Sequence, residues 1–95
     1  MKERESLARR GFLLAGRVQG VGFRCWAART ARALGVCGTV RNLPDGRVEV
    51  HAAGPHGAMA LFRHRLALGP PAASVDEIEE IPPHEPFPRE FRIIP

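Results

Sequence analysis

Residues 16–24 read GRVQGVGFR, with three glycines and two arginines in nine positions. The stretch separates an apolar run at residues 11–15 from a helical pattern that begins at Phe23. The apolar run suits a central strand or a short buried helix, and the glycines on both sides favour the strand. The stretch therefore predicts a strand, a tight glycine-rich loop and a helix, in that order.

The predicted helix is amphipathic. Arg29 and Arg32 lie on its polar side, and Gly35 ends it because glycine readily adopts the left-handed conformation of a helix C-terminus. The opposite side carries residues spaced by three and four positions: Phe23, Trp26, Ala27, Thr30, Ala31 and Leu34.

A hairpin is predicted next. Residues 43–46, LPDG, form a turn because proline presets its own φ, aspartate bonds the backbone ahead and glycine accepts a positive φ. Residues 36–42 form the strand before it and residues 47–53 the strand after it. One face of the first strand carries Val36, Gly38, Val40 and Asn42. In the second strand Val48, Val50 and Ala52 oppose Arg47, Glu49 and His51.

The C-terminal half predicts a second helix and further strands. Pro55 opens the helix as its first residue, and GPP at residues 69–71 stops it. Its apolar spacing is traced by Ala58, Leu61, Phe62, Leu66 and Gly69. Residues 74–81 read as a fourth strand, the proline-rich residues 82–88 as an extended connection, and residues 91–94 as a short edge strand.

This order of elements predicts an α+β fold. Strand, helix, strand, strand, helix, strand is the ferredoxin-like split βαβ arrangement, βαββαβ, in which two helices cover one face of an antiparallel sheet. A short fifth edge strand is expected at the end. A chain of 95 residues fits one domain, so we expect residues 1–95 to form a single domain, and a monomer.

The topology predicts that Asn42 lies close to the glycine-rich loop. The first helix runs back from the edge of the sheet at which that loop lies, and the second strand returns the chain to the same edge. The side chain of Asn42 has the same parity as those of Val36 and Val40, so it faces the helices. Asn42 and Arg24 should therefore converge.

The loop has the character of an anion site. Gly16, Gly20 and Gly22 allow backbone N–H groups to turn inward, and the loop leads into a helix N-terminus. Arg24 contradicts the usual charge preference there, and an anion would compensate it. Its planar guanidinium can hold two phosphate oxygens while amides hold a third. The alternative is that the glycines only form a tight turn and that Arg24 extends into solvent.

Composition narrows the remaining choices. The net charge is +4, and 13 of the 14 basic residues are arginine, which fits an anionic partner or a solvated basic surface. No 18-residue apolar run occurs and residues 1–10 are charged, so we expect no membrane segment, no export signal and a cytoplasmic location. Cys25 and Cys37 suit free thiols. The four histidines lack metal-ligand spacing, so no metal is expected.

The motif GRVQGVGFR, GTVRN at residues 38–42 and DGRVEV at residues 45–50 closely resemble the acylphosphatase family. The resemblance spans about residues 10–94. It implies a small ferredoxin-like enzyme that hydrolyses the carboxyl-phosphate bond of acyl phosphates to a carboxylate and inorganic phosphate, with no metal or other cofactor. It also implies that Arg24 binds phosphate and that Asn42 positions the attacking water.

This chemistry fits the residues. A carboxylate leaves readily, and phosphoryl transfer depends mainly on positioning and charge stabilisation, so no nucleophilic side chain is needed. On this interpretation Asn42 orients water. The phosphate oxygens are held by Arg24 and the amides of Gln19, Gly20, Val21 and Gly22.

Two other functions remain open on the same fold. An RNA-binding module would need aromatic side chains on the central strands, and residues 47–53 have none, so we expect no nucleic-acid partner. A non-catalytic module that senses an anion would have the same glycine-rich loop, so the loop alone does not exclude it. The presence of both Arg24 and Asn42 favours the enzyme.

Overall fold

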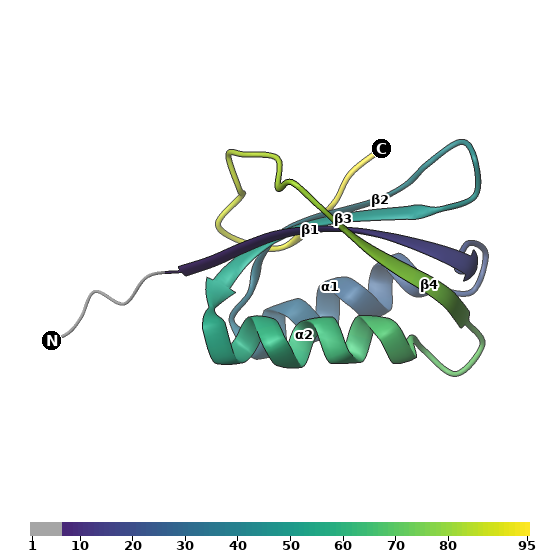
Figure 1. The fold of residues 1–95 in the computed structure, drawn as a ribbon, viewed down its shortest axis with the longest axis horizontal. Helices are drawn as coiled ribbons and strands as arrows, with labels where there is room; N and C mark the ends of the chain where they lie inside the picture. Colours follow the sequence, from purple (N-terminus) through teal and green to yellow (C-terminus); the bar gives the residue numbers. More distant parts are fainter. Residues whose placement is uncertain (1–6) are drawn as a thin grey trace, which may run out of the picture.

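The computed structural model describes residues 7–95, which form two helices and five strands in the predicted order (Figure 1). The elements are β1 (Leu7–Arg17), α1 (Phe23–Leu34), β2 (Cys37–Asn42), β3 (Val48–Pro55), α2 (His56–Leu68), β4 (Ser74–Ile81) and β5 (Arg92–Ile93). The predictions about an export signal and about a domain from residue 1 extend to residues 1–6, which lie outside the described residues. Neither helix of residues 7–95 is long and apolar enough to cross a membrane.

The strands form one sheet in the order β4-β1-β3-β2-β5. Strand β3 pairs antiparallel with both β1 and β2, and β4 pairs antiparallel with β1. The short β5 runs parallel to β2 at the edge. Both helices lie on the same face of the sheet (Figure 1). This arrangement confirms the ferredoxin-like α+β prediction, including the fifth edge strand.

The core fills the space between that face and the helices. It includes Phe12 and Val50 from the two central strands and Phe62 from α2, all fully buried. The ring of Phe91, just before β5, meets Phe62 edge-on with ring centroids 5.7 Å apart, a favourable aromatic geometry. The C-terminal segment is thus part of the core and holds β5 beside β2.

Two details of the second helix differ from the prediction. Pro55 is the last residue of β3 and the N-cap of α2, with φ −57° and ψ 149°, so its extended conformation belongs to the strand. The buried side of α2 is formed by Met59, Phe62 and Leu66, whereas Leu61 is 49% exposed. The periodicity alone allowed Leu61 beside Phe62, but packing against the sheet selects the face centred on Phe62.

The opposite face of the sheet, which carries Glu49 and His51, is partly covered. His51 on β3 is 8% exposed because the proline-rich segment after β4 covers it, and the backbone N–H of His84 donates to His51 Nδ1 at 3.0 Å. Next to it, Arg41 Nε donates to Glu49 Oε1 at 2.6 Å. The polar residues of β2 and β3 therefore form a partly buried network.

Candidate active site

The loop between β1 and α1 has the backbone geometry of an anion-binding loop. Gly20 and Gly22 have φ of 74° and 77°, whereas Val21 between them has no positive φ. An added Cβ at either glycine would meet nothing within 4 Å, so glycine is required there for its conformation and not for space. Alternation of this kind forms the concavities in which successive N–H groups bind anions.

Gly16, by contrast, does not belong to this loop. It lies in β1 at a β-bulge, where the register with β4 shifts between Ala15 and Gly16. Its φ is 123°, and an added Cβ would collide with the carbonyl oxygen of Ser74. The prediction that Gly16 contributes to the anion site is therefore wrong, because this glycine serves the close approach of β1 and β4.

The first turn of α1 opens beside the loop without a cap. Gly22 is the N-cap residue, and neither a side-chain cap nor an acidic residue is present in the first turn. The first intrahelical bond runs from Trp26 N to Gly22 O at 3.1 Å, so the N–H groups of Phe23, Arg24 and Cys25 precede it. These groups give the helix N-terminus its partial positive charge.

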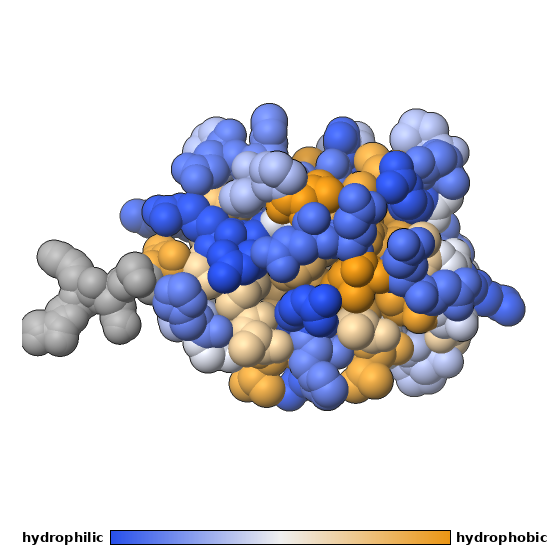
Figure 2. Space-filling model, viewed as in Figure 1, coloured by the Kyte–Doolittle hydropathy of each residue, from blue (hydrophilic) through white to orange (hydrophobic). Residues whose placement is uncertain are grey.

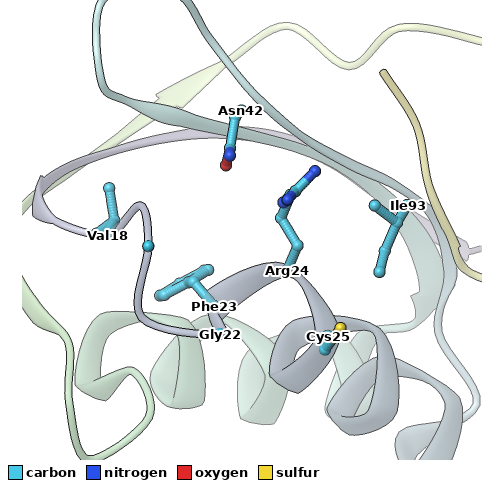
Figure 3. Close-up of a pocket in the computed structure, with 8 residues that line it drawn as sticks. Val18, Gly22, Phe23, Arg24, Cys25, Asn42 and Ile93 are labelled. Carbon is cyan, nitrogen blue, oxygen red and sulfur yellow. The ribbon is translucent and has the colours of Figure 1, made fainter.

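A pocket of about 170 Å³ joins the loop, the helix start and two strands (Figure 3). The guanidinium of Arg24 extends from α1 into this space, and the carboxamide of Asn42 points into it from the end of β2 (Figure 3). The residues lining the pocket are Val18, Gly20, Gly22, Phe23, Arg24, Cys25, Asn42 and Ile93. The structure thus brings together the arginine and the asparagine that are 18 positions apart in sequence.

Arg24 carries a positive charge that no side chain of residues 7–95 offsets. Arg41 and Arg47 pair with Glu49 and Asp45, at 2.6 and 2.9 Å, but Arg24 has no such carboxylate. It also lies at the positive end of α1. An anion in the pocket would relieve both sources of positive potential.

Asn42 carries an unpaired hydrogen-bond acceptor. Its Oδ1 is buried and, within the described part of the chain, has no hydrogen-bond partner. A buried acceptor without a partner costs about 1–3 kcal/mol, so a native structure rarely keeps one without a functional reason. The oxygen is in the pocket that Arg24 enters, and a bound water or ligand can supply the missing donor.

The predicted site residues fall into two groups. Gly20, Gly22, Arg24 and Asn42 line the pocket, whereas Gln19 and Val21 do not. The side chain of Gln19 instead donates to carbonyl oxygens of the β2–β3 turn.

The prediction missed Val18, Phe23, Cys25 and Ile93 as lining residues. Phe23 and Cys25 follow directly from a helix that starts at Phe23, so the sequence contained their signal. Ile93 reaches the pocket only because β5 pairs parallel with β2, and no local pattern encodes that pairing.

The residues of the pocket favour an anion over a cation. None of its lining residues within 7–95 is a carboxylate or a histidine, and those residues contain no group of three His, Cys, Asp or Glu side chains placed to hold a metal ion. Cys25 and Cys37 are free thiols, and Cys25 is exposed at the rim of the pocket.

The fold and the site define a small α+β protein with an electropositive pocket large enough for a phosphate-sized anion. The sequence model of the acylphosphatase family matches residues 10–93. A crystal structure of acylphosphatase from Bacillus subtilis has the same fold, with a TM-score of 0.83 and 35% identity over 94% of this chain and 99% of that chain.

Two relatives are closer in sequence. An acylphosphatase of Thermus thermophilus is 54% identical over 67 residues, 70% of this chain and 76% of that protein. One of Halorhodospira halophila is 50% identical over 80 residues, 84% of this chain and 87% of that protein. This chain therefore belongs to the acylphosphatase family and is an enzyme with acylphosphatase activity.

Proposed function

We propose that the pocket around Arg24 performs this activity by holding the phosphoryl group of an acyl phosphate against a water molecule oriented by Asn42. The guanidinium and the amides of the loop and the first turn of α1 bind the phosphoryl oxygens. The water oxygen bonds to phosphorus as the bond from phosphorus to the acyl oxygen breaks. Its electron pair leaves with the carboxylate, and inorganic phosphate is the second product.

The unpaired Oδ1 of Asn42 carries this proposal. A water that attacks phosphorus must direct a lone pair at the phosphorus, so its hydrogens must point to acceptors. The Asn42 oxygen is a fixed acceptor in the same pocket as the uncompensated Arg24. A module that only bound an anion through Arg24 would not need a carboxamide acceptor directed into the same pocket.

The reaction needs no general acid or general base from the protein. In the loose transition state of phosphoryl transfer, charge is spread over the equatorial oxygens, and catalysis consists mainly of positioning and charge stabilisation. A carboxylate leaves without protonation by a general acid. The water's proton passes to an oxygen of the transferred phosphoryl group, since no carboxylate or histidine lines the pocket.

The size of the pocket favours recognition of the phosphoryl group. At about 170 Å³ it is smaller than the roughly 300–1,000 Å³ of sites that enclose a drug-sized ligand. It encloses a phosphoryl group and leaves the acyl group toward solvent. The proposed substrates are therefore acyl phosphates as a class, bound without a metal or another cofactor.

We also propose that the enzyme is a single-domain, cytoplasmic monomer. Residues 7–95 share one sheet and one core, which supports a single domain, residues 1–95. Hydrophilic side chains separate hydrophobic ones over much of the face seen in Figure 2, which supports a monomer. The central-strand residues 47–53 carry no Phe, Tyr or Trp on which bases could stack, which supports the absence of a nucleic-acid partner. The two free cysteines support a cytoplasmic location.

The test compares the wild type with Arg24→Ala, Arg24→Lys and Asn42→Ala on a simple aromatic acyl phosphate, with inorganic phosphate as competitive inhibitor. Arg24→Ala should raise KM and lower kcat, and Arg24→Lys should also lose most activity because an ammonium cannot bind two oxygens as a fork. Asn42→Ala should lower kcat by roughly 100- to 1,000-fold, the loss seen when one catalytic hydrogen-bonding group is removed.

The inhibition constant of phosphate separates the two roles. Arg24→Ala should raise it strongly, whereas Asn42→Ala should leave it nearly unchanged. If Asn42→Ala weakened phosphate binding and left kcat intact, Asn42 would be a phosphate ligand and the proposed water would be wrong. Activity should also persist in EDTA, and a loss that magnesium restores would show that a metal takes part.

A further inference from the structure

The side chain of Gln19 joins the phosphate-binding loop to the turn between β2 and β3. Its Nε2 donates to the carbonyl oxygen of Leu43 at 2.8 Å and to that of Arg47 at 2.9 Å, in a partly buried contact. The acceptors lie 24 and 28 positions further along the chain. The loop and the turn emerge at the same end of the sheet in Figure 1. The two hydrogen bonds of the Gln19 carboxamide bridge them.

Gln19 holds the base of the turn at both of its ends. The carbonyl of Arg47 also accepts from Leu43 N at 2.8 Å, and the carbonyl of Leu43 accepts from Gly46 N at 3.1 Å. An amide nitrogen has two hydrogens, so Gln19 uses both of them on this turn. The nitrogen must face the two carbonyls, because the amide oxygen in its place would meet two acceptors.

The hydrogen bonds of Gln19 to Leu43 and Arg47, here called the Gln19 clamp, lie next in sequence to the phosphate-binding loop and to Asn42. Gln19 precedes Gly20 of the phosphate-binding loop, and Leu43 follows Asn42. We infer that Gln19 is a positioning residue, whose side chain fixes the separation between the bound phosphoryl group and the carboxamide of Asn42. The inference rests on the proposed roles of Arg24 and Asn42, and it is separate from the predicted phosphate contact of the Gln19 amide.

The expected effect is on the attack and not on phosphate affinity. Arg24 and the amides beside it are held by α1, and Val18 anchors the loop in the core with 1% exposure. Loss of the clamp would therefore leave the geometry of the phosphate site unchanged, while Asn42 shifts relative to that site. A displacement of about 1 Å from the geometry of attack can cost on the order of 100-fold in rate.

Gln19→Met tests this, since methionine matches the length of glutamine and lacks both donors. We expect kcat to fall roughly 10- to 100-fold, while the inhibition constant of inorganic phosphate changes by less than about threefold. Gln19→Glu, which presents only acceptors to the two carbonyls, should lose at least as much kcat. Urea unfolding of each variant shows that the measured protein is folded.

Arg32→Met is the matched control. Arg32 also donates twice to a backbone carbonyl, that of Phe91, from Nε at 3.1 Å and from Nη2 at 2.6 Å, but it does not line the pocket. Its loss should lower stability and leave kcat near that of the wild type. An equal loss of kcat in both methionine variants would overturn the inference, because general loosening would then explain it.

A double-mutant cycle with Asn42→Ala gives the decisive readout. If Gln19 acts through the placement of Asn42, Gln19→Met should reduce kcat little once Asn42 is already alanine. Fully additive losses, or a phosphate inhibition constant that rises as much as kcat falls, would show instead that Gln19 builds the loop. Should Asn42→Ala alone leave kcat unchanged, the proposed water-orienting role fails, and that result is distinct from additivity.

Discussion

The proposed catalytic role of Asn42 is supported by an interaction that its side chain lacks. Its Oδ1 is buried with no partner within residues 7–95, although the surrounding backbone of β2 is paired with β3. On the proposed mechanism, this acceptor is kept because it orients the attacking water, although it weakens the folded state. Stability and activity should therefore respond in opposite directions when this side chain is replaced.

Asn42→Leu removes the unpaired acceptor and keeps the shape of the side chain. The free energy of unfolding should rise by about 1 kcal/mol, because the desolvation cost of the buried oxygen disappears. Acyl phosphate hydrolysis should be lost at the same time. Urea unfolding followed by circular dichroism measures the first effect, and a drop in stability of the folded protein would show that Oδ1 is satisfied in solution.

At the scale of elements, the start of α1 depends on backbone conformation. Gly22 has φ of 77°, and the space around it is open, so a side chain there is strained but not blocked. Gly57, in the first turn of α2, has no positive φ and also faces open space. The same substitution should therefore have opposite effects in the two helices.

Gly22→Ala should lower the free energy of unfolding by about 1–2 kcal/mol, the cost of the left-handed conformation for a residue with a Cβ. Gly57→Ala should raise it by about 0.4–1 kcal/mol, because alanine restricts the unfolded chain without strain in the helix. Chemical denaturation of both variants checks this pair. Equal and positive effects would show that the Gly22 conformation is not fixed in solution.

The β2–β3 hairpin also carries a pH-dependent contribution to stability. Burial of Glu49 raises the pKa of its carboxyl, but the hydrogen bond and charge of Arg41, together with His51, outweigh burial and hold the pKa below its ordinary value of 4.5. A lowered pKa in the folded state stabilises the protein above the unfolded pKa. That contribution is lost as the pH falls below about 4.5 through the folded pKa.

Glu49→Gln should therefore lower Tm at pH 7, and the difference from the wild type should shrink as the pH falls below about 4.5. Glu80→Gln is the control, since Glu80 pairs with Arg10 at 3.1 Å but its side chain is 52% exposed, against 17% for Glu49. Its effect at pH 7 should be smaller because solvent screens such a pair. A Tm difference for Glu49→Gln that is constant with pH would contradict the assignment.

At the scale of the whole molecule, the sequence predicted the features that depend on residues close together in the chain, namely the helices, the strands and their order. The periodicity after Phe23 and the alternation after Gly46 set the element order, and that order alone placed Asn42 beside the loop. The parallel pairing of β5 with β2, the burial of His51 under residues 82–88 and the clamp of Gln19 on Leu43 could not be predicted. Each joins segments far apart in sequence and depends on packing that no local pattern encodes.

Binding of phosphate should stabilise the whole fold, because the site joins a loop, a helix and two strands that are assembled only in the native state. At a phosphate concentration about 100 times the dissociation constant, linkage predicts roughly 2.7 kcal/mol of added stability. For a domain of about this size, each kcal/mol raises Tm by roughly 4–8 °C. Thermal unfolding in phosphate, compared with chloride at equal ionic strength, measures the shift.

Arg24→Ala should abolish most of this shift, whereas Arg29→Ala should keep it, since Arg29 is exposed on the same helix but does not line the pocket. Asn42→Ala should also keep the shift if, as proposed, its carboxamide acts on the water and not on the bound anion. If phosphate stabilised Arg24→Ala as much as the wild type, the anion would bind elsewhere on this arginine-rich surface. The proposal that the pocket binds the phosphoryl group would then be wrong.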